Sequence, residues 1–184
     1  MKKIRFITIS VIVFLMIIFT SITIYERSYL PPEKALNYFS KLIKYGKIRD
    51  LNLTIYYMSP SFFTLMPTSI DDLTKIQSKF VTVINVSNLE DHVDLLKQIS
   101  SDALIPIKNE SRIDARFYYV FKNKFNRKIF DVAMWGDDYN VYVNGFEFKS
   151  NDIFYDIVMP FLSEDMVTNL EVNRDDAKRV NRRE

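Results

Sequence analysis

Residues 6–25 form an apolar run that constrains the chain more than any other feature of its sequence. The run contains no charged residue and is dominated by Ile, Val, Phe, Leu and Met. Its 20 residues would rise about 30 Å as a helix, which matches the hydrocarbon core of a bilayer. A buried helix of a water-soluble domain seldom stays apolar on every face over this length. The run therefore predicts a transmembrane helix.

The charges that flank this run predict its orientation. Three basic residues precede it, Lys2, Lys3 and Arg5, and basic flanks of a span stay on the cytoplasmic side. We therefore expect residues 1–5 to be cytoplasmic and the domain after the span to be extracytoplasmic. The predicted location is the cell membrane, crossed once.

A cleaved signal peptide is the alternative to a retained signal anchor. Cleaved peptides have an apolar core of about 7 to 15 residues that ends in a small-x-small site. The run here is longer, and its best pair of small residues, Ser21 and Thr23, lies among the bulky Ile22 and Ile24. Retention as an anchor is therefore the interpretation that the sequence favours.

The absence of cysteine excludes several chemistries. None of the 184 residues is a cysteine, so disulfides, thiolate catalysis, thiolate metal sites and a lipidated cysteine are excluded. Residues 28–165 must therefore fold by burying apolar side chains, and they are enough for one domain. Without the three basic residues that precede the span, 22 basic residues remain against 23 acidic ones, a net charge of −1. This balance gives no reason to expect a nucleic-acid partner.

Hydrophobic periodicity predicts an α+β domain after the span. Helical patterns cover residues 31–46, 69–77, 89–100 and 152–162, and strand patterns cover residues 51–59, 79–86, 112–121, 128–135 and 139–148. Ser69 is the expected cap of the second helix, and Asn144 with Gly145 is the expected two-residue hairpin turn. Strands joined by short turns favour a mainly antiparallel sheet with the helices grouped on one face.

The C-terminal segment, residues 166–184, reads as a polar tail. From Glu171 onward it contains almost no apolar residue and mixes both charges. Such a segment has little apolar surface to bury, so we expect disorder or a frayed helix.

The residues required for common catalytic sites are missing. His92 is the only histidine, and the three glycines, Gly46, Gly136 and Gly145, are too scattered for a phosphate-binding loop. We expect no catalytic residue, no metal and no cofactor. The abundance of Ile, Lys, Asn, Phe and Tyr is typical of an AT-rich bacterial genome, which suggests a bacterial cell surface.

One pair of acidic residues leaves an enzymatic alternative open. Asp137 and Asp138 lie beside the only tryptophan, Trp135, at a predicted turn between strands. Two carboxylates about 5 to 10 Å apart are sufficient for glycoside cleavage. A cell-wall glycoside hydrolase is therefore an alternative function, although adjacent acids at a turn are more often solubilising residues.

Aromatic residues on the predicted sheet indicate a binding surface instead. Alternation places Tyr118 and Tyr142 on the face opposite the larger apolar residues of their strands. If that face is uncovered, the two tyrosines, with Trp135, Asp137 and Asp138, form a candidate binding surface. The function that the sequence favours is a non-enzymatic module that binds another protein or an envelope component. A further alternative is an accessory subunit of a membrane complex that is contacted through the span itself.

Overall fold

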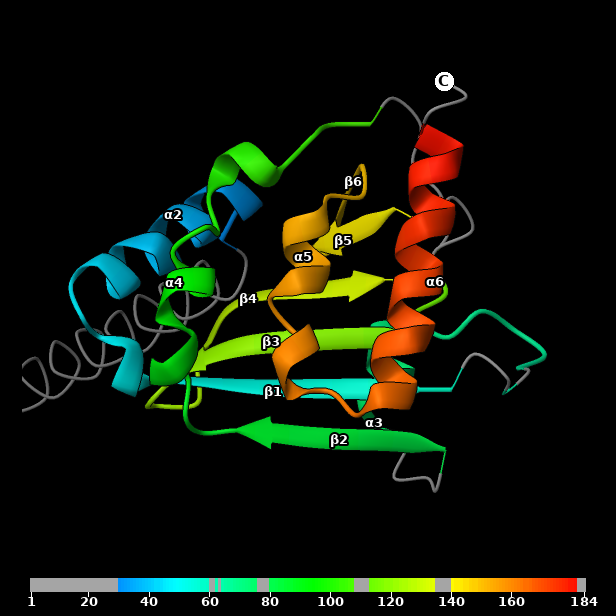
Figure 1. The fold of residues 1–184 in the computed structure, drawn as a ribbon, viewed down its shortest axis with the longest axis horizontal. Coiled ribbons are helices and arrows are strands. Elements are labelled where there is room, and N and C mark those ends of the chain that lie inside the picture. The colour runs from blue at the N-terminus through cyan, green and yellow to red at the C-terminus, as the bar shows by residue number, and fades with distance from the viewer. Residues whose placement is uncertain are drawn as a thin grey trace, which may run out of the picture. The chain divides into compact units, whose positions relative to one another are not determined.

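The domain is built on one antiparallel sheet. The computed structural model describes residues 30–59, 62, 64–75, 80–107, 113–134 and 140–181, and the chain from Pro31 onward forms a compact unit. Six strands lie in the order β2-β1-β3-β4-β5-β6, as Figure 1 shows. Their bounds are β1 Leu51–Met58, β2 Val81–Val86, β3 Phe117–Asn123, β4 Lys128–Met134, β5 Val141–Val143 and β6 Phe146–Phe148. The predicted α+β class and antiparallel sheet are confirmed.

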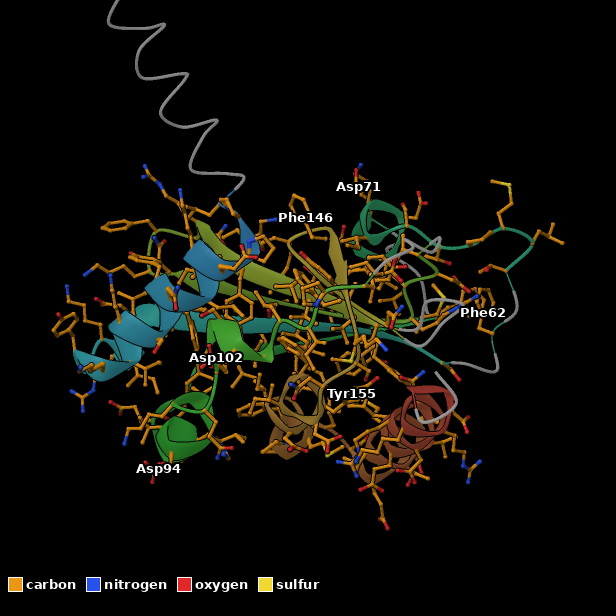
Figure 2. The ribbon with its side chains drawn as sticks, turned by 90° about the horizontal axis from the view of Figure 1, so that it is seen from above. Phe62, Asp71, Asp94, Asp102, Phe146 and Tyr155 are labelled. Carbon is orange, nitrogen blue, oxygen red and sulfur yellow. The ribbon has the colours of Figure 1, made fainter. Side chains whose placement is uncertain are left out.

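The helices lie on both faces of the sheet. One face carries α2 Pro32–Lys44, α4 Val93–Leu96, α5 Asp152–Asp156 and α6 Glu164–Asn181, and the other carries α3 Ile70–Lys75. Figure 2 shows this separation, with Asp71 of α3 and Tyr155 of α5 on opposite sides of the sheet. Short 3-10 helices lie at η1 Ile48–Asp50, η2 Glu90–His92, η3 Ser101–Ala103 and η4 Met159–Phe161. The prediction that all helices group on one face is therefore wrong for α3.

Aromatic rings fill the core beneath α2 and α5. Phe39 of α2 packs edge-on against Phe121 and Phe130, with ring centroids 4.8 and 5.0 Å apart. Tyr119 is fully buried, and its hydroxyl donates to the carbonyl oxygen of Phe154 at 3.0 Å. Alternate residues of β3 and β4 thus form one continuous apolar surface, as the period of two in a strand requires.

The opposite face has a smaller core of its own, which explains why α3 lies there. We call this set the second-face cluster: Met58, Leu73, Ala115, Tyr118, Val120, Ala133 and Tyr142. Leu73 of α3 is fully buried in it. The apolar residues on this side of β1, β3 and β4 would otherwise meet water, so α3 covers them.

Two local predictions are confirmed at the level of single residues. Asn144 and Gly145 have φ angles of 51° and 82°, which is the backbone that a type I′ hairpin turn needs. At α3, the Ser69 hydroxyl accepts a hydrogen bond from the Asp72 N–H at 3.1 Å and donates to the Asp72 carboxylate at 2.6 Å. These contacts satisfy a donor at the start of the helix.

A helix, α6, occupies most of the segment 166–184, for which the sequence predicts a disordered tail or a frayed helix. The helix is anchored by polar contacts. The Tyr155 hydroxyl donates to Asn173 Oδ1 at 2.9 Å, and the Arg174 guanidinium pairs with Asp156 at 3.2 Å. The described part of this segment is therefore helical, with Leu170 fully buried and Asn173 2% exposed.

The apolar run at residues 6–25 lies outside the described residues, so the predicted span stays a prediction. Among the residues described, none of the helices combines the length and the apolar character needed to cross a bilayer.

Candidate functional site

The structure describes two of the five residues that the sequence predicts for a binding surface. Trp135, Asp137 and Asp138 lie outside the described residues. Tyr118 and Tyr142 do share a face, since both pair with Ala133 across the sheet. Each is only 6% exposed, however, because both belong to the buried second-face cluster. The uncovered face on which that hypothesis depends is not present at these two tyrosines.

An ion pair between the buried Asp131 and the exposed Lys128 lies beside Tyr118. Asp131 is 4% exposed, and its Oδ2 accepts hydrogen bonds from Lys128 Nζ at 2.7 Å and from the Tyr118 hydroxyl at 3.1 Å. Its backbone N–H donates to Asn144 Oδ1 at 3.0 Å. Burial and the Asp131 carboxylate raise the pKa of Tyr118 well above its usual range. Tyr118 therefore remains a protonated donor that connects β3 to β4, and it cannot act as a base at neutral pH.

A polar groove lies between the end of β1 and the start of α6. Its volume is about 490 Å³, and it is lined by Tyr57, Ser59, Ser163, Asp165, Met166, Thr168 and Asn169. The Asn169 side-chain amide donates to the Tyr57 hydroxyl at 3.0 Å. Asp165 is the single carboxylate in this described lining, whereas glycoside cleavage requires two. The groove thus gives no support to the hydrolase alternative.

Metal-binding residues and the remaining acidic and histidine side chains are the next candidates for a site. No group of three or more His, Asp or Glu side chains is arranged to hold a metal ion among these residues. The ring of His92 packs edge-on against Phe161, with centroids 4.7 Å apart. Asp71 pairs with Lys75 at 2.8 Å on the surface of α3.

The two edges of the sheet differ in their protection. At β6, Pro106 forms a β-bridge with Phe148, and the Lys149 N–H donates to the Ile105 carbonyl at 2.9 Å. At the other edge, β2 pairs with β1 on one side only, and Figure 1 shows no described element beyond it. Among the described strands, none pairs with the outer backbone groups of β2, and such groups of an edge strand can bind a further strand.

The side chains of β2 also favour pairing. Residues 81–86, which we call the β2 edge, have the sequence VTVINV, with no charge and no proline. Thr82, Val83 and Asn85 are exposed, and Val83 is 49% exposed. Edge strands of monomeric proteins usually carry charges, prolines or bulges that prevent pairing with another chain. The β2 edge has none of these in its six residues.

Apolar side chains extend this surface at one end of β2. Phe80 is 47% exposed and stacks on Phe62 with centroids 4.2 Å apart. The Arg116 guanidinium donates to the Phe62 carbonyl at 2.9 Å and so holds the loop in place. Farther along that loop, Leu65 and Met66 are 106% and 70% exposed. Of these exposed apolar residues, Phe80 directly precedes β2 in the chain, and exposed apolar groups that adjoin a sheet edge are typical of interaction sites.

No protein-family model matches the chain, and neither a curated protein nor a solved structure matches it. Function is therefore inferred from the geometry of the described residues. Sequence reasoning missed the β2 edge, because a strand pattern does not show where the strand lies in the sheet. The signal that could have found it is the lack of any charge or proline in residues 81–86.

Proposed function

We propose that the protein is a non-enzymatic binding module, held at a bacterial cell surface by residues 6–25, whose extracytoplasmic domain binds an extended strand along the β2 edge. The observation that supports this proposal is the open, uncharged β2 edge with Val83 half exposed. In strand addition, main-chain hydrogen bonds provide affinity and side chains on alternate positions provide specificity.

The chemistry of the edge explains why a strand is the fitting partner. The outer N–H and C=O groups of an edge strand bond to water until another strand replaces that water. Val83 then gains an apolar neighbour from the incoming chain, as cross-strand pairs stabilise sheets. Phe80, which stacks on Phe62, provides further apolar surface at one end, where a longer partner could extend.

The membrane tether complements this weak mode of binding. A short strand pair buries less area than a standard protein interface of about 1,600 Å², so its affinity in dilute solution is low. Tethering raises the effective concentration of partners that are held at the same membrane.

Photo-crosslinking in native membranes tests the proposal. A photoreactive residue at Val83 of the full-length chain should give adducts that depend on irradiation. The matched control is the same residue at Phe125, which is 72% exposed on the β3–β4 turn. Adding Thr82→Lys should reduce the Val83 adducts about tenfold, since a charge opposes strand pairing. Equal adducts at both positions, or none at Val83, would contradict the proposal.

The alternatives have no support among the described residues. A hydrolase depends on Asp137 and Asp138, and an accessory subunit contacted through its span depends on residues 6–25. All of these lie outside the described residues.

A further inference from the structure

We propose that the strand which completes the β2 edge is β2 of a second copy of this chain. The two sheets then join across a two-fold axis into one continuous antiparallel sheet. This inference rests on the proposed function, because it names the partner of the same edge.

Symmetry restricts how two copies of β2 can pair. An antiparallel pair of identical strands is self-complementary, so each copy presents the same surface to the other. Residues directly opposite one another point to the same face of the sheet. One such register places Val83 opposite Val83 of the second copy, with Thr82 opposite Ile84 and Val81 opposite Asn85.

The exposure of the side chains selects this register. Val83 is 49% exposed, so pairing it with itself removes apolar surface of both copies from water. The alternative register, centred on Ile84, would place the exposed Val83 opposite the polar Asn85. Ile84 is already partly buried, and it therefore gains less than Val83 from a central position.

The absence of charge explains why a second copy is the favoured partner. In a self-pair centred on Val83, a charged residue within residues 82–84 would lie opposite or diagonal to its own copy, and like charges opposite each other destabilise a sheet. No residue of the β2 edge is charged. Copies anchored in one membrane also meet at high effective concentration.

The lack of cysteine in the chain allows a direct test. A single cysteine can form a disulfide only with the same cysteine of another copy, because the parent sequence contains none. Opposite residues of antiparallel strands have Cα atoms about 4.5 to 5.5 Å apart, which is within the disulfide range of about 4.4 to 6.8 Å. Val83→Cys in the full-length chain, oxidised in native membranes, should therefore give a covalent dimer.

Matched variants separate strand pairing from random collision. Val81→Cys and Asn85→Cys would lie about 14 Å from their own copies, since four residues of a strand span that distance. Each should give at least about tenfold less dimer than Val83→Cys. Phe125→Cys, on a side chain that is 72% exposed, should behave in the same way. As a second measurement, Thr82→Cys and Ile84→Cys expressed together should form a mixed disulfide.

The outcomes distinguish this inference from the proposed function. Dimer yields that are equal at residues 81, 83 and 125, or no dimer at 83 and no mixed disulfide, would overturn self-pairing. If Val83 still photo-crosslinks to a different protein, the strand-binding function stands and only the second copy is excluded. If Val83 gives neither product, both proposals fail.

Discussion

At the scale of single residues, Asp131 is a carboxylate that is buried on one face of the sheet. Its carboxylate lies on the second face with an exposed fraction of 4%. A buried charge is costly unless it is paired and hydrogen-bonded. Lys128 and Tyr118 both bind Oδ2, while Oδ1 has no hydrogen-bond partner among the described atoms. The hydrogen bond from the Tyr118 hydroxyl therefore stabilises this buried carboxylate.

Replacement of Tyr118 should reveal this role. Tyr118→Phe removes one donor from Asp131 and leaves the ring in place, so the free energy of unfolding should fall by about 1 to 3 kcal/mol. Urea unfolding of the full-length protein in detergent, followed by far-UV circular dichroism, measures the change. Tyr45→Phe is the matched control, since Tyr45 is 73% exposed. Equal losses in the two variants would contradict the role of the buried hydrogen bond.

Buried tyrosines should also make the fold sensitive to alkali. Burial raises the pKa of Tyr118 and Tyr119 well above the usual value, and it raises the pKa of Tyr155 to about 12. In the unfolded chain these phenols ionise near pH 10. Above that pH the folded state retains protons that the unfolded state releases, so stability falls as pH rises. Their contribution is fully present below about pH 9 and declines from about pH 10 upward.

Urea midpoints between pH 8 and pH 11.5 measure this decline. Each buried tyrosine should add up to about 1.4 kcal/mol of lost stability per pH unit above 10. Tyr155→Phe should therefore show a shallower decline than the parent protein. Identical slopes for the two proteins would mean that the Tyr155 hydroxyl is accessible to ionisation in the folded state.

At the scale of elements, α6 is a helix that apolar periodicity does not predict. The strands, the Ser69 cap and the Asn144–Gly145 turn are predictable because each depends on local residue preferences. The helix α6 is not, because its polar side chains Asn173, Arg174 and Asn169 contact residues far away in sequence, beside the fully buried Leu170. Polarity alone suggests a disordered tail, and only the positions of Tyr155, Asp156 and Tyr57 show otherwise.

A double-mutant cycle measures how strongly α6 is coupled to α5. Tyr155→Phe and Asn173→Ala each break the same 2.9 Å hydrogen bond. Their combined cost should therefore be smaller than the sum of the single costs, with a coupling energy of about 0.5 to 3 kcal/mol. Thermal or urea unfolding of the three variants provides the values. Strict additivity would show that the two groups stabilise the fold independently.

The order of the strands in the sheet also determines which part of the candidate site the sequence could predict. Alternation correctly assigns Tyr118 and Tyr142 to one face of the sheet. It does not show whether a helix covers that face, because the contact between α3 and the strands joins distant segments. The β2 edge follows from the strand order, in which β1 lies between β2 and β3. The strand order itself leaves no local signal in sequence, and the lack of charge and proline in residues 81–86 indicates only that β2 could pair with another strand.

At the scale of the whole molecule, the proposed function gives the predicted span and the domain complementary roles. The domain has cores on both faces of its sheet and an open, uncharged edge. If residues 6–25 span a membrane, they would keep neighbouring chains in that membrane, where weak strand pairing between them becomes effective. This arrangement requires that the domain lies outside the cell and stays attached.

The most direct test is labelling of Phe125→Cys in intact cells with a maleimide that cannot cross membranes. The chain has no other cysteine, and Phe125 is 72% exposed, so the label reports the location of the domain alone. We predict labelling of the full-length protein without lysis, with the labelled protein recovered in the membrane fraction. Labelling only after lysis, or a labelled domain released into the medium, would contradict a tethered extracytoplasmic binding module.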